Sequence, residues 1–579
     1  MGNLRDRSIL FLTLLLAAAC AGPGNTVQSP DRSSQAPSSS SSSNKTIVVA
    51  FRYEKNDLST KTLTQAGQEY RMLFNAGLAL VDGQGTVQPY LAENVPQLNT
   101  DTWKLLPDGR METSYRIRPN LTWHDGAPLT ANDFVFAWRV YSAPGIGIFS
   151  PQPQDHMEEV AAPDAQTLTI RWANPFPDAA LLTNEDFPPL PRHLLESAFT
   201  TFQQDSATRD LFVNHRYWNP DYVGAGPFRL EHLEPGSHLE ASAFAGHALG
   251  RPKVDRVIAR IIPDENTVLS GVLANAIHVA TSITLRFEHA MTLRRTWTGT
   301  SQGAVAWNPA RLVGSIFQFR PEFLRTPALL DARVRRALVY GIDRQALNEG
   351  IFDGQSVIPE TYLNPQAPYY PQVYAAISKY SYDPRMAEQL LNEAGIAKDG
   401  NGVFAGSAVE RFNPDYQVLT GTTFERGGAI IEDSWRRMGI EVQYSVLPAV
   451  QVRNNEVRNS FPGISTPGGG ILSERALVEF FTGQQIGTPS NGWTGSNRGA
   501  WPSAEYDRLF SAFNVTLDRS ERNAQIAQMM KLLSDEVPGF PQYLDIDVMG
   551  YVGSVKGPSL GITGTSTPLW NTYQWELQV

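Results

Sequence analysis

The chain contains a single cysteine, Cys20, and this constrains how the rest of it can be stabilised. One thiol can form neither a disulfide within the chain nor a cluster of thiolate ligands around a metal ion. The folded part must therefore rely on packed hydrophobic cores. The chain has 579 residues, 42% of them hydrophobic, and this length exceeds what one core usually supports. We expect two or three lobes.

Cys20 closes a short apolar segment near the N-terminus. Arg5 and Arg7 precede an apolar run over residues 9–19, which ends in three alanines. A positive start, a short apolar core and small residues before the cut describe a secretory signal, and the run is about half the length that a membrane-spanning helix needs. Residues 16–20 (Leu-Ala-Ala-Ala-Cys) resemble a bacterial lipobox, which implies that Cys20 becomes a lipid-modified N-terminus. The alternative is an ordinary signal peptide with an incidental cysteine.

Residues 21–44 follow the cysteine and are rich in Ser, Pro, Gly and Gln, with unbroken serines from 38 to 43. Such a stretch buries too little apolar surface to offset the entropy lost on ordering it. We therefore interpret residues 1–20 as a lipoprotein signal peptide and residues 21–44 as a flexible tether. The folded body is then expected to be extracytoplasmic and lipid-anchored, on the periplasmic side of a membrane or on the outer cell surface.

The charge balance argues against two classes of partner. The net charge is −10 and the isoelectric point is about 5.5. A protein that binds nucleic acid needs a basic stripe to neutralise phosphates. A broad polybasic membrane patch would also need clustered cations. We expect no nucleic-acid partner, and membrane contact through the lipid alone.

Helical and strand-like segments alternate along the body, which predicts a mixed α/β class. β-branched and alternating patterns at residues 45–51 and 111–118 predict strands. Helix starts are indicated where a capping residue precedes apolar positions at helical spacing: Thr130, Asp331, Asp383 and Asp518.

The helix predicted from Asp331 has three arginines off its apolar stripe: Arg333, Arg335 and Arg336. Asp331 stands four residues before Arg335, a spacing that favours an ion pair on a helix. One interpretation of the arginines is an anion-binding cluster. A solvated helix face is the favoured one.

Motifs for catalysis are weak. The pattern Gly-x-Ser-x-Gly occurs at residues 299–303 and 557–561, but a nucleophile elbow also needs a helix after the serine, and neither site precedes a helical pattern. The nine histidines form no H-x-x-x-H or H-x-H pair, and there is no phosphate-binding loop. We expect no cofactor, no metal site and no enzymatic activity. A lipid-anchored hydrolase stays open as the less favoured class.

Six segments in order resemble one family. Residues 115–133 (Tyr-Arg-Ile-Arg-Pro-Asn-Leu-Thr-Trp-His-Asp-Gly-Ala-Pro-Leu-Thr-Ala-Asn-Asp) closely resemble a signature of the peptide/nickel class of ABC-transporter solute-binding proteins. The other matching segments are 78–93, 224–228, 334–344, 382–395 and the region from Tyr506 to Pro538. Together they cover nearly the whole body.

The resemblance implies a two-lobe, periplasmic-binding-protein-like α/β fold (class II-type) with an extra subdomain in the first lobe. Lobe I is expected to comprise residues 45–88, 222–300 and 545–579. Residues 89–221 are expected to form the inserted subdomain, and residues 301–544 lobe II.

The resemblance also implies the function. The protein would capture a small ligand, with an oligopeptide favoured, by lobe closure, and would deliver it as a monomer to an ABC import permease. An oligosaccharide or another non-peptide solute is the alternative ligand. A peptide-pheromone or chaperone-like receptor is an alternative role for the same fold.

One family feature is missing. Many peptide binders of this family place a Trp and an Asp late in the large lobe, where the Asp pairs with the peptide's ammonium group, but residues 461–470 contain neither. A buried ammonium group without a partner is costly. We expect that Glu54 or Glu474 takes this role, or that the ligand is neutral there.

Aromatic and small polar side chains suit a ligand cleft, and four groups of candidates follow from position. They are the end of the first strand (Arg52, Tyr53, Glu54), the strand entering lobe II (Phe317, Phe319), the glycine-rich stretch (Ser465, Thr466) and the Trp-containing loop (Trp493, Arg498).

Overall fold

The computed structural model describes residues 45–54, 58–59, 61, 68–147, 152–218, 220–406, 411–471, 474–561 and 568–578. Cys20, with the predicted signal peptide and tether, lies outside these residues. Within the described ranges, no helix combines the length and the apolar character needed to cross a membrane.

A mixed sheet of eleven strands organises the body. Its order is β16-β15-β17-β12-β19-β11-β1-β10-β9-β8, with β18 also beside β12. Pairing is parallel where β1 meets β10 and β11 and where β15 meets β16 and β17, and antiparallel elsewhere. The bounds are β1 (Thr46–Phe51), β8 (Phe228–Glu234), β9 (His238–Ala243), β10 (Arg256–Ile261), β11 (Val279–Thr281), β12 (Gly303–Phe317), β15 (Asp415–Leu419), β16 (Gln443–Leu447), β17 (Ile464–Thr466), β18 (Gly469–Ile471) and β19 (Gly539–Val552).

The part of the body built mainly from residues 46–297 has a second, antiparallel sheet in the order β4-β5-β7-β6. One large hydrophobic core underlies it and the β1 end of the main sheet. The remaining elements here are β2 (Ala79–Val81), β3 (Val87–Pro89), β4 (Trp103–Leu105), β5 (Met111–Arg116), β6 (Met157–Ala161), β7 (Thr167–Trp172), α1 (Gln68–Phe74), α2 (Ala131–Tyr141), α3 (Arg192–Gln204), α4 (Arg209–Val213), α5 (Glu265–Leu273) and α6 (Phe287–Trp297). A C-terminal pair, β20 (Val555–Lys556) and β21 (Glu576–Leu577), joins the same core.

The part that follows β12 packs helices around β15–β17, over two further hydrophobic cores. A buried tryptophan ties two of its helices together, because Trp435 Nε1 donates to the carbonyl oxygen of Leu338 at 2.7 Å. The elements are α7 (Ala332–Tyr340), α8 (Arg344–Phe352), α9 (Tyr370–Ala376), α10 (Pro384–Glu393), β13 (Ala397–Lys398), β14 (Phe404–Ala405), α11 (Thr422–Met438), α12 (Asn455–Asn459), α13 (Glu474–Glu479), α14 (Ala504–Val515) and α15 (Arg519–Glu536).

The predicted α/β class is confirmed, and so are the elements on which it rested. Strands β1 and β5 occupy the two ranges predicted to be strands. Helices α2, α7, α10 and α15 begin directly after Thr130, Asp331, Asp383 and Asp518. Three of these residues accept hydrogen bonds from helix backbone N–H groups, whereas at α2 the carboxylate of Asp133 accepts from the backbone N–H of Thr130 at 2.8 Å.

The predicted ion pair between Asp331 and Arg335 is wrong. Asp331 pairs with Arg333 at 2.6 Å, while Arg335 is 4% exposed. The Arg335 guanidinium donates instead to backbone carbonyls just before α7 and at the end of α15: those of Leu329, Leu330, Glu536 and Val537. Carbonyls at a helix end have no partner within the helix, so a buried arginine here satisfies them. Arg335 is therefore a structural contact, whereas Arg333 on the same helix is 47% exposed, as the prediction of a solvated face requires.

Two of the matching sequence segments meet in space at His124. Its Nδ1 accepts from the Gly224 N–H at 3.2 Å and its Nε2 donates to the Gly226 carbonyl oxygen at 3.0 Å. These bonds require the neutral ring, and burial lowers the pKa of His124 to about 4. Gly224 admits no side chain, because a Cβ there would lie 1.9 Å from the Phe74 carbonyl oxygen. These motif residues thus fix the scaffold.

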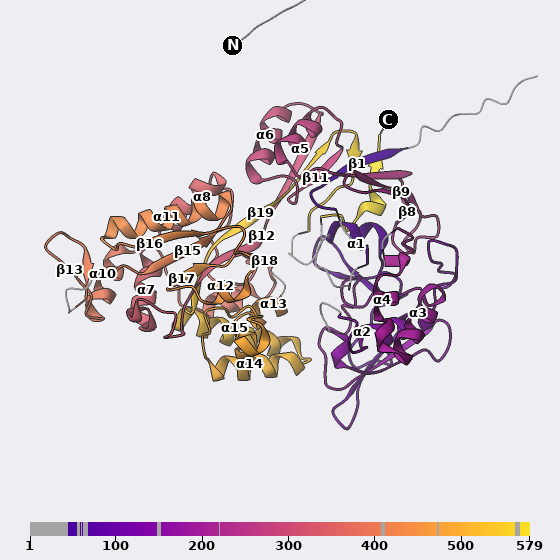
Figure 1. The fold of residues 1–579 in the computed structure, drawn as a ribbon, viewed down its shortest axis with the longest axis horizontal. Helices are drawn as coiled ribbons and strands as arrows, with labels where there is room; N and C mark the ends of the chain where they lie inside the picture. The colour runs from indigo at the N-terminus through magenta and orange to yellow at the C-terminus, as the bar shows by residue number, and fades with distance from the viewer. Residues whose placement is uncertain are drawn as a thin grey trace, which may run out of the picture. The chain divides into compact units, whose positions relative to one another are not determined.

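The pair β12–β19 runs between the two parts of the body (Figure 1). It extends from Gly303 opposite Val552 to Ile316 opposite Gly539, with two irregularities, one after Pro309 and one after Val313. Proline cannot donate to a ladder, so a bulge at Pro309 is expected.

An ion triad lies at this bulge. Arg311 Nη2 lies 2.6 Å from Asp545 Oδ2, and its Nε lies 3.3 Å from Asp547 Oδ1. Residues two apart on a strand point to the same face, so the Asp-Ile-Asp sequence presents both carboxylates to one arginine. Burial raises the pKa of Asp547, and the charge of Arg311 opposes that rise.

We predict that Arg311→Met destabilises the protein increasingly as the pH rises. Breaking a fully buried pair costs about 3–5 kcal/mol; because the Arg311 side chain is 36% exposed, we expect about 2 kcal/mol. Without Arg311 the folded-state pKa of Asp547 rises further above its unfolded value, so stability is lost as the pH rises from about 4 through that pKa. Urea unfolding at several pH values measures this.

The matched control is Arg508→Met, which removes one partner of the exposed Arg508–Glu505 pair and should cost less than about 1 kcal/mol at every pH. An equal, pH-independent loss in both variants would contradict a special role for the triad.

Candidate functional site

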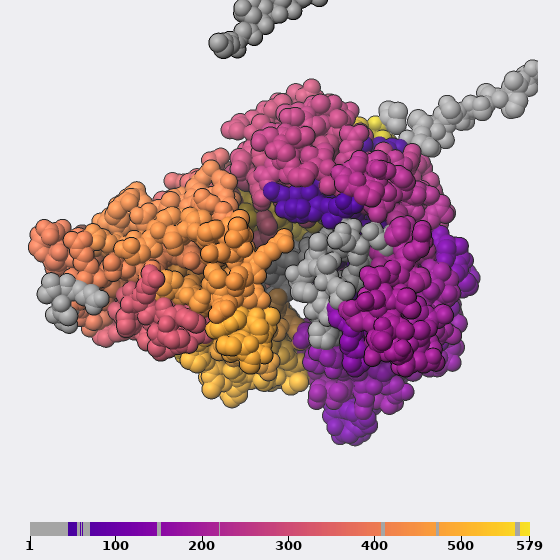
Figure 2. All heavy atoms as spheres, viewed as in Figure 1, coloured from indigo at the N-terminus to yellow at the C-terminus, as the bar shows by residue number. Residues whose placement is uncertain are grey.

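The first group of predicted site residues lies at the carboxyl end of β1. Tyr53 is 63% exposed, and the first described segment reaches the surface beneath α5 and α6 (Figure 2). Arg52 Nη1 lies 2.5 Å from Glu265 Oε1, which also accepts from Arg286 Nε at 2.9 Å. Glu54 accepts from the Gly236 N–H at 2.8 Å. Of the three, only Tyr53 presents mostly free side-chain surface.

The two phenylalanines at the end of β12 lie within packed cores. Phe317 has no exposed surface and packs against Phe540, with 5.8 Å between ring centroids. Phe319 is partly buried and lies under the guanidinium of Arg335, 4.9 Å from ring centroid to Cζ. In this structure both rings act in packing.

Ser465 and Thr466 are buried in β17. Thr466 Oγ1 lies 2.7 Å from Ser315 Oγ and 3.1 Å from the Tyr416 hydroxyl, and it accepts from Gln542 Nε2 at 3.1 Å. The four side chains form a closed polar network across neighbouring strands. Thr466 is 1% exposed, so its hydroxyl is used to satisfy buried neighbours, as buried polar groups require.

Trp493 and Arg498 lie in a loop that one arginine organises. Arg320 donates to the carbonyl oxygens of Arg498 and Gly487, both at 2.7 Å, and to that of Asn459 at 3.1 Å. Its Cζ also lies 5.8 Å from the Trp493 ring centroid. The loop is therefore fixed to the end of α12 by bonds that the sequence did not reveal.

The two parts of the body touch where residues 176–178 meet α13 and α15. The Arg475 Cζ lies 5.5 Å from the Phe176 ring centroid, and Arg522 Nη2 lies 3.8 Å from Asp178 Oδ1. Arg522 also pairs with Glu474 at 3.1 Å. None of these side chains was predicted to contact the other lobe, because the contact joins segments about three hundred residues apart.

Glu474, one of two carboxylates expected to meet a peptide's ammonium group, is already paired. Arg519 Nη2 lies 2.6 Å from it, in addition to Arg522. Burial acts to raise the pKa of Glu474, but hydrogen bonds and charge from these arginines outweigh it and lower the pKa. The carboxylate of the other candidate, Glu54, accepts a hydrogen bond from the Gly236 N–H.

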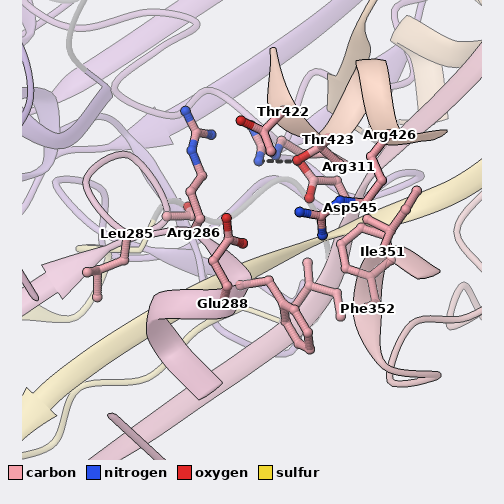
Figure 3. A pocket seen from close by; sticks show the side chains of 13 residues that line it. Leu285, Arg286, Glu288, Arg311, Ile351, Phe352, Thr422, Thr423, Arg426 and Asp545 are labelled. Atoms are coloured by element: carbon pink, nitrogen blue, oxygen red, sulfur yellow. Dashed lines mark hydrogen bonds and ion pairs between the residues drawn. The ribbon is translucent and has the colours of Figure 1, made fainter. Parts of the chain in front are cut away.

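A pocket borders the ion triad of β12 and β19 (Figure 3). Arg286 and Glu288 lie at its α6 side and Arg426 at its α11 side, around the Arg311–Asp545 pair. The pocket is lined by charged groups on both sides and lies at the strands that connect the two parts of the body. Across the described part of the chain, no group of three or more His, Cys, Asp or Glu side chains is arranged to hold a metal ion.

Comparison with known proteins identifies a family that has this architecture. The model for bacterial extracellular solute-binding proteins, family 5, matches residues 93–476, more than half of the chain. The oligopeptide-binding protein AppA of Bacillus subtilis is 21% identical over 543 residues, which are 92% of this chain and 91% of AppA.

Two solved structures illustrate the shared fold. The oligopeptide-binding protein of Thermus thermophilus, complexed with a pentapeptide, has a TM-score of 0.71 at 20% identity and covers 92% of this chain and 96% of its own. NikA of Brucella suis, in complex with Fe(III)-EDTA, has a TM-score of 0.73 at 15% identity over 92% and 100% of the two chains. The predicted two-lobe fold is thereby confirmed. The chain belongs to the bacterial extracellular solute-binding proteins, family 5.

Proposed function

We propose that this protein captures an oligopeptide outside the cytoplasm, closes its two lobes on it and delivers it to an ABC import permease. The observation that carries the proposal is the family match over residues 93–476, together with the similarity to AppA along nearly the whole of both chains. The ligand itself is proposed from these relatives.

The proposed lobes follow the sheets. We assign residues 45–88, 222–300 and 545–579 to lobe I, residues 89–221 to its inserted subdomain and residues 301–544 to lobe II. All strands of the second sheet fall between Trp103 and Trp172, which supports the inserted subdomain. The β12–β19 pair then forms the connection about which the lobes move.

Ligand binding would drive closure because a ligand shifts a two-state equilibrium by its differential affinity for the two states. A micromolar ligand supplies about 8 kcal/mol. Inverting a hinge equilibrium from 1:99 to 99:1 needs about 5.5 kcal/mol of preference. Binding at this affinity is sufficient, and the permease would then recognise the closed form. The protein is proposed to act as a monomer.

We propose that the ligand leaves chemically unchanged. Ser301, in one of the two Gly-x-Ser-x-Gly sequences, directly precedes strand β12 and not a helix, which argues against a nucleophile elbow. Ser559, in the other, follows β20, and the residues from 562 to 567 lie outside the described part.

The test of the proposed function is ligand capture. We expect native mass spectrometry of the purified protein to detect a co-purifying peptide. A peptide library should raise the melting temperature, because a ligand at a concentration of 100 times its dissociation constant adds about 2.7 kcal/mol to the free energy of unfolding. Chromatography should then recover the peptides intact. Stabilisation by oligosaccharides alone would redirect the proposal to a sugar ligand. Cleaved peptides would instead indicate a hydrolase.

Cys20 is proposed as the lipid anchor. Replacing Cys20 with Ser removes the thiol that would carry the lipid, so the protein should move from the membrane fraction to the soluble fraction on cell fractionation. Mass spectrometry of the wild-type N-terminus should show a diacylglyceryl group. If the Cys20→Ser protein stays with the membrane, the anchor lies elsewhere.

A further inference from the structure

The two parts of the body are joined at a second place besides the β12–β19 pair. The loop after β7 contacts α13 and α15: the Arg475 Cζ lies 5.5 Å from the Phe176 ring centroid, and Arg522 Nη2 lies 3.8 Å from Asp178 Oδ1. In Figure 1, α13 and α15 lie below the β12–β19 pair, on the opposite side from α5 and α6. A contact outside the strand pair restrains any rotation of one part against the other about those strands.

On the lobe II side, the contact lies on a segment that begins at the connecting strands. β18 pairs with Arg311–Val313 of β12, which are the three residues between the two irregularities of the β12–β19 ladder. Helix α13 begins at Glu474, three positions after Ile471 at the end of β18. Three residues of extended chain span at most about 11 Å. The start of α13 is therefore tied closely to the strand about which the lobes are proposed to move.

Helix α13 is also fixed to the helices of lobe II. Glu474 pairs with Arg519 at 2.6 Å and with Arg522 at 3.1 Å, both in α15. At the other end of α13, the Tyr506 hydroxyl of α14 donates to the Val478 carbonyl oxygen at 2.9 Å. The three helices thus form one unit, so that Arg475 and Arg522 move together with lobe II.

The surface that they meet in the inserted subdomain is equally well held. Phe176 is 5% exposed, and its ring stacks on Trp172 with 4.7 Å between centroids and 10° between planes. The His156 ring stacks on Phe176 as well, at 5.2 Å. Both sides of the contact are therefore formed by their own lobes, and the contact can break and form again without unfolding either lobe.

The contact is weak enough to be reversible. The 3.8 Å separation of Arg522 and Asp178 is longer than a charge-assisted hydrogen bond, and Arg475 Nε is buried without a hydrogen-bond partner among the described residues. An exposed ion pair or a cation over an aromatic ring each biases an equilibrium by about two- to fivefold, and the two together by about 3- to 30-fold. Such a contact shifts the populations of two states but does not lock either one.

We propose that Phe176 and Asp178, together with Arg475 and Arg522, form a latch that holds the two lobes toward each other before a ligand arrives. The proposal rests on the proposed lobe closure and adds how the ligand-free protein is poised for it. The apparent dissociation constant of a ligand rises when the binding-competent state is less populated. The latch would therefore increase affinity through the population of the closed form.

The experiment measures distances between spin labels on the two lobes by double electron–electron resonance. Cys20 is the only cysteine, so the Cys20→Ser protein can carry labels at Leu105→Cys and Val515→Cys, two exposed positions. In protein freed of co-purified ligand, Asp178→Asn and Arg475→Gln should each lower the ratio of short to long distances by about two- to fivefold, and the double variant by about 3- to 30-fold.

The matched controls are Asp101→Asn and Arg508→Gln. Each removes one partner of an exposed ion pair within a single lobe, Asp101 with Lys104 and Arg508 with Glu505. Neither control should change the distances. Circular dichroism confirms that each variant is folded.

Adding pentapeptides of random sequence forms the second arm. The wild type should shift to short distances, and the latch variants should need more peptide, by up to the factor measured without it. Unchanged distances in the ligand-free latch variants would overturn the latch, and shortening by pentapeptides in the same samples would leave the proposed function standing. Longer distances in the latch variants alone, with no response of the wild type to pentapeptides, would support the latch and count against the peptide function. Tighter peptide binding by the latch variants would overturn the latch.

Discussion

The antiparallel pairing of β12 with β19 is the constraint on which the rest of the structure depends. These strands belong to one sheet with both β1 and β17, so the hydrophobic cores on either side are organised by a shared backbone ladder. The pairing is interrupted after Pro309, and there Arg311 lies between the carboxylates of Asp545 and Asp547. A long ladder resists stretching, whereas a bulge is a place where a strand can bend. The ion triad therefore lies at the bulge, where the strand pair can bend, and its charged contacts link β12 to β19 at that point.

Two arginines organise the part of the body that follows β12 through bonds to backbone carbonyls. Arg320 and Arg335 are satisfied by backbone carbonyls and hold loops and helix ends in place. Guanidinium groups suit this because their five donors lie in a fixed plane. Each of them joins segments that lie far apart in the sequence, since Arg320 reaches Asn459 and Arg498, and Arg335 reaches Glu536.

Local features of the fold could be predicted from the sequence, and non-local ones could not. Thr130, Asp331, Asp383 and Asp518 marked helix starts because capping involves residues only a few positions apart. Two of the carbonyl partners of Arg335, those of Glu536 and Val537, lie about two hundred residues away, so helical spacing pointed to Asp331 instead. Phe317 was expected near the ligand from its place at a strand end, but strand alternation cannot say which face a neighbouring helix covers. Arg320 carried no signal at all, because only the fold brings its carbonyl partners at Asn459, Gly487 and Arg498 to it.

The central claim is that a ligand closes two lobes about the β12–β19 connection. Small-angle X-ray scattering of the protein, freed of co-purified ligand and then saturated with a peptide shown by calorimetry to bind, tests it most directly. The account predicts that the radius of gyration falls on saturation and that the scattering returns to its starting curve when the peptide is removed. Identical scattering with and without the bound peptide would contradict closure.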